Sequence, residues 1–202
     1  MKRNLVKKLA VTGALSALSI LLGVTKLGFI PFAGAAITIL HVPVIIGAIL
    51  EGPVVGLIIG LIFGAWSMIQ AAISPTGVLD PFFVNPLVSV VPRACIGLVA
   101  WAVFYLLRKI KILPKIIPAA VAAFFGSLTN TVLVIGSLFL LFRNEIAQIF
   151  DNKGFIVVIA GLMPQALIEA AAAVIITVAV VGCISGYTNS KKKSRLSEAE
   201  ED

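Results

Sequence analysis

The sequence predicts an all-α membrane protein with six transmembrane helices and with both the N and C termini in the cytoplasm. Of its 202 residues, 60% are hydrophobic and only 12% are charged, so a soluble domain of this size could not hide its apolar surface from water. The apolar residues occur in long runs, and a run of about 20 is enough to cross a bilayer. The basic residues flank these runs on one side of the membrane, which sets the orientation.

We expect the six helices near residues 5–24, 36–51, 53–73, 87–107, 116–141 and 155–184. The second and third come from one apolar run, 36–73, which as a single helix would be roughly 57 Å long at about 1.5 Å per residue. That is far longer than a hydrocarbon core of about 30 Å. Glu51-Gly52-Pro53 supplies a helix stop and a restart inside the run, so we predict two helices, the first of them short.

Basic residues settle the orientation of the helices. Twelve of the 16 fall on one side of the membrane only if the chain crosses it six times. Because cytoplasmic loops carry an excess of Lys and Arg, this side is the cytoplasm. The twelve precede the first helix, separate the fourth from the fifth and follow the sixth: Lys2, Arg3, Lys7, Lys8, Arg108, Lys109, Lys111, Lys115, Lys191, Lys192, Lys193 and Arg195.

The chain divides into a membrane domain at 1–187 and a polar segment at 188–202, which we expect to be a disordered cytoplasmic tail. The net charge of +7 follows from the flanking basic residues, which lack interleaved aromatics, so nucleic-acid binding is disfavoured. The sequence contains neither a Gly-rich phosphate loop nor a nucleophile beside a base. We therefore expect no enzymatic activity of the chain on its own, and any ATPase that drives transport is another chain.

Small residues line one face of the first helix. Ala10 and Ala14, and the offset pair Gly13 and Ala17, are each four apart and therefore share a helical face. Small side chains let a second helix approach closely in lipid. Two interpretations stay open: a contact with the protein's own helices, or docking to another membrane protein. Gly56, Gly60 and Gly64 have the same spacing in the third helix and predict a close helix contact there.

The most unusual stretch for a membrane helix is 80–93, which combines three prolines with an Asp, an Asn and an Arg. Asn85, Ser89 and Arg93 repeat every four residues and form one polar stripe, as is typical of a cavity or a bundle interior. The planar fork of Arg suits a carboxylate. The alternative for Arg93 is an interfacial anchor that snorkels to the headgroups.

Two further predicted helices send polar groups inward from the outer half: Thr129 and Asn130, and Gln165 and Glu169. A carboxyl group at this depth must be protonated, paired or wet. His41, the sole histidine of the sequence, is either a hydrogen-bonded structural residue or a ligand contact. Without a Cys/His cluster it predicts no metal site, and we expect no cofactor. The loop at 25–37 is too apolar to be freely solvated and is expected to fold over the bundle, whereas the loop at 142–154 is polar.

In three segments the chain resembles the substrate-binding S components of energy-coupling factor (ECF) vitamin transporters, and most of all their pantothenate-type branch. The segments are His41-Val-Pro-Val-Ile-Ile-Gly-Ala-Ile-Leu-Glu-Gly-Pro-Val-Val-Gly56, Asn85-Pro-Leu-Val-Ser-Val-Val-Pro-Arg93 and Leu128-Thr-Asn-Thr131. The resemblance covers roughly 5–185. It implies a multi-pass protein of a prokaryotic cell membrane that binds a vitamin from outside. The chain departs from the family at Glu51, where an apolar residue is expected.

The resemblance also implies partners and roles. Such subunits dock through the first helix, at Ala10 and Ala14, onto a membrane coupling subunit that carries two cytoplasmic ATPases. For pantothenate, Arg93 is expected to bind the carboxylate, and Asn85 and Asn130 the amide or hydroxyls. Gln165 and Glu169 are expected to bond hydroxyls or to hold the pocket. The remaining site residues are Thr129 and His41, with Trp66, Phe82 and Phe83 against the apolar part of the vitamin.

Three alternatives remain open from the sequence. The chain is an S component for another vitamin, such as riboflavin or folate. It is a stand-alone secondary transporter with Glu169 as a proton relay, although we find no convincing inverted repeat. Or it is an intramembrane enzyme, which the single His and the absence of a nucleophile pair disfavour.

Overall fold

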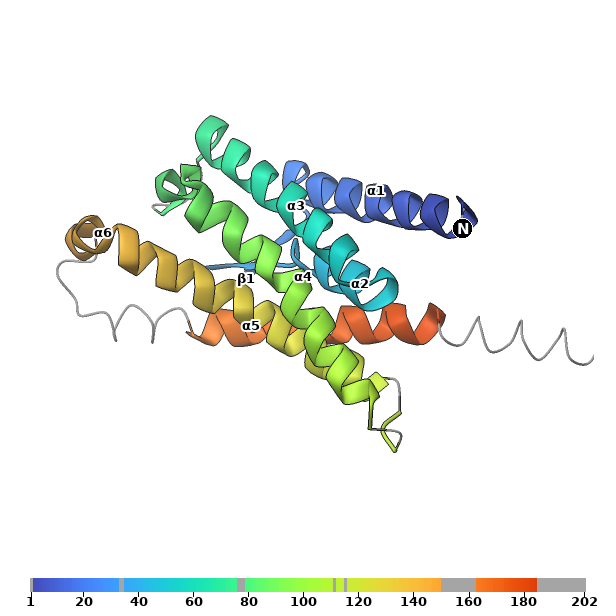
Figure 1. Cartoon of the computed structure of the whole chain (residues 1–202). Coiled ribbons are helices and arrows are strands. Elements are labelled where there is room, and N and C mark those ends of the chain that lie inside the picture. The colour runs from blue at the N-terminus through green and yellow to red at the C-terminus, as the bar shows by residue number, and fades with distance from the viewer. Residues whose placement is uncertain are drawn as a thin grey trace, which may run out of the picture.

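The computed structural model describes residues 2–32, 35–75, 79–110, 112–114, 116–149 and 163–184. Helices dominate these ranges. Figure 1 shows α1 along one edge of the bundle, and α5 with the C-terminal helix at the opposite edge. The elements are α1 (Lys2–Val24), β1 (Phe29–Phe32), β2 (Ala35–Thr38), α2 (Val42–Glu51), α3 (Pro53–Ile73), the short 3-10 helix η1 (Asp80–Val84), α4 (Pro86–Arg108), α5 (Ile116–Leu141), α6 (Arg143–Ile149) and the C-terminal helix Met163–Ile184.

Five of the described helices are long and apolar enough to cross a membrane: Leu5–Val24, Pro53–Ile73, Pro86–Arg108, Ile116–Leu141 and Met163–Ile184. Four of them agree with the predicted bounds to within a residue. The fifth lies inside the predicted 155–184 helix, whose residues 155–162 are outside the described ranges, as is the predicted tail at 188–202. The multi-pass helical architecture is therefore confirmed.

The prediction of a helix from residue 36 is wrong. The helix here is α2, which has 10 residues and begins only at Val42. Pro43 lies in its first turn, where the fixed φ of proline and its missing N–H favour a helix start. At about 1.5 Å per residue, α2 is too short to cross a bilayer alone. It is instead buried from Val42 to Ile49, at the centre of the hydrophobic core.

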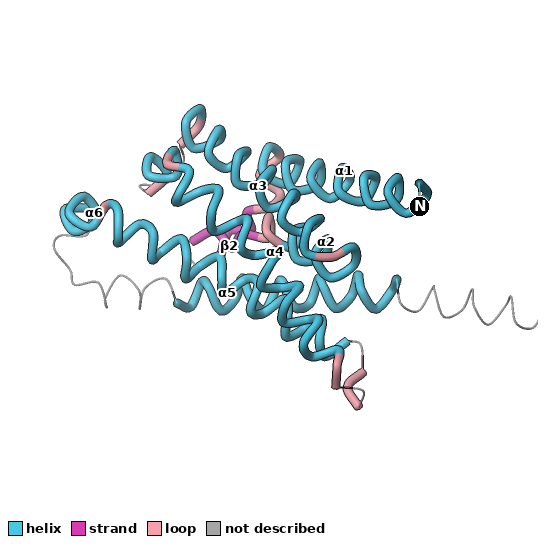
Figure 2. Tube along the Cα trace, viewed as in Figure 1, coloured by secondary structure: helices cyan, strands magenta, loops and turns pink. Residues whose placement is uncertain are grey.

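The residues before α2 form a β-hairpin, the exception to the expected all-helical fold in the described ranges. β1 and β2 pair antiparallel, with Phe29 opposite Thr38 and Phe32 opposite Ala35. Figure 2 shows the hairpin among the helices, and a hydrogen bond joins Thr38 to the C-terminal helix. The expectation that the apolar 25–37 segment folds onto the bundle is confirmed in this form. Part of the predicted polar loop at 142–154 is also regular, because α6 covers Arg143–Ile149.

The predicted break between the second and third helices lies at Gly52. This residue has φ of 105° and ψ of 179°, a conformation that glycine adopts without a steric penalty. Pro53 then opens α3. The preceding Glu51 forms an ion pair with Lys7 of α1, with 2.6 Å between Oε1 and Nζ. This pair explains a carboxylate where the family resemblance predicts an apolar residue, and it places the N-terminal part of α1 beside the α2–α3 turn.

The predicted glycine contact of the third helix is confirmed, and its partner is α4. A Cβ on Gly56 would lie 3.1 Å from the Cα of Gly97. A Cβ on Gly64 would lie 2.7 Å from the Cα of Val90. Glycine is required along this face because the two backbones touch. The contact fixes the height and rotation of α4, the helix that carries Arg93.

Candidate functional site

Arg93 is buried inside the helix bundle. Its side chain is 7% exposed, and its guanidinium carbon lies 5.0 Å from the ring centre of Phe83 and 5.7 Å from that of Phe63. Nη1 donates a hydrogen bond of 2.7 Å to the carbonyl of Val88, one turn back in α4. Within the described ranges no carboxylate forms an ion pair with Arg93. A buried guanidinium without an anionic partner is a site prepared for an anion.

Polar atoms of several predicted site residues are buried without a hydrogen-bond partner among the described residues. They are Nε of Arg93, Nε2 of His41, Nε1 of Trp66 and Oδ1 of Asn130. Three hydroxyl groups, those of Ser16, Ser127 and Thr177, share this property. Since buried polar groups are nearly always paired, these atoms are candidates for hydrogen bonds to a bound molecule. The four residues come from α4, the start of α2, α3 and α5, and Nε1 of Trp66 lies on the α1 side of α3, 2.9 Å from where a Cβ on Gly23 would be.

His41 is buried at the start of α2. It occupies the N-cap position of α2 but makes no capping hydrogen bond through its side chain, which is 1% exposed. Its Nε2 is one of the buried atoms without a hydrogen-bond partner among the described residues. In the part of the chain that the structure describes, no group of three or more His, Cys, Asp or Glu side chains is placed to hold a metal ion. The geometry therefore favours a ligand contact for His41.

Glu169 and Gln165 form hydrogen bonds within the protein. Oε1 of Glu169 accepts hydrogen bonds from both the backbone N–H and the hydroxyl of Thr38, each at 2.9 Å. The amide Nε2 of Gln165 donates a third, at 3.2 Å. The carboxylate thus ties the C-terminal helix to the β-hairpin. This agrees with a pocket-holding role and argues against a freely exchanging proton relay.

We expect Glu169→Ala to lower the thermal unfolding midpoint of the purified protein. The substitution leaves the N–H and hydroxyl of Thr38 without their acceptor, and losing hydrogen bonds to a charged group costs about 1.5–3 kcal/mol each. Thr38→Val, which removes only the hydroxyl bond, should lower the midpoint less. Glu145→Ala, at an exposed carboxylate of α6, is the matched control and should leave it unchanged. Equal midpoints for Glu169→Ala and Glu145→Ala would contradict the tether.

Three further predicted site residues have contacts within the protein, local for Asn85 and Thr129 and long-range for Phe82. Oδ1 of Asn85 accepts a bond of 2.9 Å from the N–H of Leu87, so this side chain caps α4. The hydroxyl of Thr129 donates to the carbonyl of Phe125 in its own helix, at 2.7 Å. Phe82 packs against Phe142, with 4.8 Å between ring centres. Phe83, in contrast, lies beside Arg93 and its carbonyl accepts a hydrogen bond from Ser89.

Sequence reasoning missed two residues, Thr38 and Phe63. Thr38 belongs to a segment expected to be helical, so no pattern paired it with a residue 131 positions away. Phe63 is one of many apolar residues in α3, so nothing in the sequence distinguishes it as a site residue. A search for aromatic residues near Gly60 and Gly64 would have found it, because those glycines mark the side of α3 that faces Arg93. Phe63 follows Gly60 by three residues and directly precedes Gly64.

The small-residue face of α1 is free of contacts within the bundle. Its four residues are exposed, and a Cβ on Gly13 would meet nothing within 4 Å. The opposite side of α1 packs inward through Ser16 and Ser19. The hydroxyl of Ser19 donates a hydrogen bond of 3.4 Å to the carbonyl of Leu40. Ala10, Gly13, Ala14 and Ala17 are all exposed, and no described residue of the bundle packs on Gly13. Among the described residues, this exposure favours the second interpretation, a surface for another membrane protein.

Comparisons with known proteins match most of the chain, including the residues described above. The family described as "ECF transporter, substrate-specific component" matches residues 7–181. The pantothenic acid transporter PanT of Lactococcus lactis subsp. cremoris is 32% identical over 168 residues, which span 76% of this chain and 80% of PanT. The family match includes the open face of α1, the hairpin, the Arg93 environment and the Glu169 tether.

Proposed function

Because the chain belongs to the family of substrate-specific components of ECF transporters, we propose that it binds pantothenate outside the cell and delivers it through an ATP-driven coupling module. Members of this family are multi-pass proteins of the prokaryotic plasma membrane that bind a substrate for a transporter and are not enzymes themselves. The choice of pantothenate is supported by the similarity to PanT and by the chemistry around Arg93.

The observation that carries this proposal is the buried guanidinium of Arg93, which forms no ion pair with any described carboxylate. Pantothenate has a carboxylate at one end, an amide in the middle and two hydroxyls beside a dimethyl carbon at the other. Arg93 binds the carboxylate through Nε and the free part of its fork, a geometry suited to two parallel hydrogen bonds. His41, Trp66 and Asn130 supply the polar atoms for the amide and hydroxyls. Phe63 and Phe83 supply apolar surface near the guanidinium.

Calorimetric titration of the purified chain with a panel of vitamins tests the substrate. We expect saturable binding of pantothenate and none of riboflavin or folate at the same concentrations. Pantothenol, which replaces the carboxylate with an alcohol, should bind far more weakly because it leaves Arg93 without its anion. Tight binding of another vitamin instead of pantothenate would reassign the substrate within the same family.

For topology, we propose six passages with both termini in the cytoplasm. The hairpin and α2 together make the second passage, which supplies the even count that five long helices lack. The Lys7–Glu51 pair and the basic end of α4 support a common cytoplasmic side. A cysteine introduced at Ile112, which is 92% exposed, should react with a membrane-impermeant thiol reagent only in inverted vesicles. Labelling in right-side-out cells would contradict this topology.

We propose that the open face of α1 docks onto the membrane coupling subunit, which in turn carries two cytoplasmic ATPases. Ala10→Leu/Ala14→Leu should abolish co-purification with the coupling subunit while leaving the affinity of the isolated chain for pantothenate unchanged. The reason is that leucine side chains prevent close helix approach at a face that lies outside the bundle.

The matched control for docking is Ala171→Leu/Ala179→Leu, which enlarges two exposed alanines of the C-terminal helix instead. This variant should still co-purify with the coupling subunit. If the α1 variant assembles as well as the control does, α1 is not the docking surface.

A further inference from the structure

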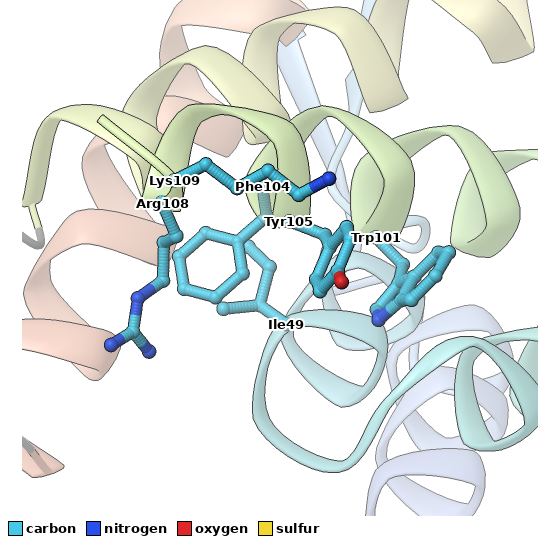
Figure 3. Close-up of a pocket in the computed structure, with 6 residues that line it drawn as sticks. All are labelled: Ile49, Trp101, Phe104, Tyr105, Arg108 and Lys109. Atoms are coloured by element: carbon cyan, nitrogen blue, oxygen red, sulfur yellow. The ribbon is translucent and has the colours of Figure 1, made fainter. Parts of the chain in front are cut away.

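A pocket lies at the C-terminal end of α4, away from the residues of the proposed vitamin site. Its volume is about 310 Å³, and Figure 3 shows the six side chains that line it. Five come from the last two turns of α4 and its C-cap, and one comes from the buried face of α2. We call it the α4-end pocket, and it is lined by Ile49, Trp101, Phe104, Tyr105, Arg108 and Lys109.

The helical repeat of α4 builds this pocket. Residues four apart lie above one another, so Trp101, Tyr105 and Lys109 form one column. The rings of Trp101 and Tyr105 stack with 5.2 Å between centres and 14° between planes. The ammonium of Lys109 lies 4.9 Å from the centre of the Tyr105 ring. Aromatic walls and a cation are thereby held in one arrangement before any ligand arrives.

A second column completes the polar rim. Arg108 follows Phe104 by four residues, and its guanidinium carbon lies 5.7 Å from the centre of that ring. Both cations of the pocket therefore rest on aromatic faces and remain exposed. Among the described residues neither forms an ion pair with a carboxylate. The pocket therefore carries two positive charges, each over its own aromatic ring, and no negative side chain lines it.

The position of the pocket determines which anion is within reach. Arg108 ends a helix of 23 residues whose window is apolar enough to cross a membrane, so the pocket lies where hydrocarbon meets headgroups. The side chains beside it are apolar and exposed, with Leu106 at 59% and Ile110 at 50%. Aromatic and basic residues at this depth contact the headgroup region from the side of the bundle. A lipid in this pocket would place its headgroup beside the basic side chains and its acyl chains along the apolar ones.

We propose that the α4-end pocket binds an anionic phospholipid, with its phosphate at Arg108 and Lys109 and its first acyl carbons against Trp101, Tyr105 and Ile49. The charge on the pocket selects an anionic headgroup, and its aromatic walls and apolar flank accept hydrocarbon. Free phosphate would use the cations but leave the apolar walls empty. The site is separate from the vitamin site and does not depend on which vitamin is bound.

Quenching of Trp101 by brominated lipid tests this proposal. The sequence has two tryptophans, so Trp66→Phe leaves Trp101 as the sole tryptophan reporter. The full chain is reconstituted in phosphatidylcholine vesicles with a small fraction of either brominated phosphatidylglycerol or brominated phosphatidylcholine. We expect the brominated anionic lipid to associate roughly tenfold more strongly, because two basic side chains near the membrane surface both attract an anionic headgroup. Arg108→Gln/Lys109→Gln in the same background should remove the preference.

The matched control is Lys8→Gln/Arg143→Gln, which removes one Lys and one Arg at exposed positions elsewhere and should keep the preference. Equal quenching by the two lipids overturns the proposal, as does a preference that survives Arg108→Gln/Lys109→Gln. Competition by millimolar inorganic phosphate would show a site for the free anion. Absence of any lipid preference, together with loss of coupling-subunit assembly in the Arg108→Gln/Lys109→Gln variant, would assign the pocket to a protein partner.

Discussion

Replacing Arg93 with alanine should raise the dissociation constant for pantothenate by about a hundredfold or more. Truncating one side of a buried, hydrogen-bonded charge pair costs about 2–5 kcal/mol, and every 1.4 kcal/mol is about tenfold in affinity. The same variant should unfold at an unchanged or higher temperature when no ligand is present. In the free protein Arg93 is buried without an anionic partner, and such a charge costs stability. Titration calorimetry and thermal unfolding with and without pantothenate measure both effects.

Two variants separate binding from structure in this experiment. Arg93→Lys keeps the charge but loses the planar fork, so its affinity should lie between those of the parent and Arg93→Ala. Arg143→Ala removes an exposed arginine of α6 and should leave affinity unchanged. If Arg93 were an interfacial anchor, Arg93→Ala would lower the unfolding temperature and bind pantothenate normally. That pair of results would remove the carboxylate assignment.

The parts of the fold that the sequence predicts well are those set by local constraints. Pro53–Ile73 and Ile116–Leu141 match their predicted bounds because the bilayer imposes a length on each apolar run. The glycines of α3 predict a close contact because only residues without a side chain permit one. Arg93 stands out for a similar reason, since lipid does not tolerate an unsolvated charge.

Sequence reasoning misses features of two kinds. Some depend on residues far apart in the chain, and others have two possible local explanations. Thr38 and Glu169 are 131 residues apart, and only the folded chain brings them together. Asn85 looks like a pocket residue because it shares a stripe with Arg93. Yet an Asn directly before a Pro is also a typical helix start, and that is the role its Oδ1 has. The strand at Ala35–Thr38 was hidden because apolar strands and helices share composition.

The two proposed activities, vitamin binding and docking to the coupling subunit, involve different parts of the bundle. Arg93, His41 and the Glu169–Thr38 bonds belong to the interior and the hairpin. Ala10 and Ala14 belong to the outer side of a helix that packs on α2 and α3 through its other side. Both α2 and α3 lie between them, because each contacts α1 and α4, and α3 meets the α4 backbone at Gly60. Coupling between docking and vitamin binding can therefore pass through either helix.

We expect Gly60→Ala to disrupt the contact between α3 and α4. A Cβ at this position would lie 2.9 Å from the carbonyl carbon of Arg93 and 3.1 Å from the Cα of Ala94. Both atoms belong to the α4 backbone, so no rotamer change relieves the clash, and α4 must move away from α3. Overpacking of this kind costs about 1–3 kcal/mol. We expect a lower unfolding temperature and weaker pantothenate binding together, because the displaced segment carries Arg93.

Gly136→Ala is the matched control for this substitution. It adds the same methyl group to a glycine of α5 whose Cβ would meet nothing within 4 Å. Alanine favours a helix over glycine by about 1 kcal/mol, so this variant should be as stable as the parent or more stable, with normal affinity. The same helix-forming gain is available at Gly60, and only the α3–α4 contact opposes it. Unfolding temperatures that rise equally in Gly60→Ala and Gly136→Ala would mean that α4 is not held against α3 at Arg93, and the proposed position of the carboxylate anchor would fail with it.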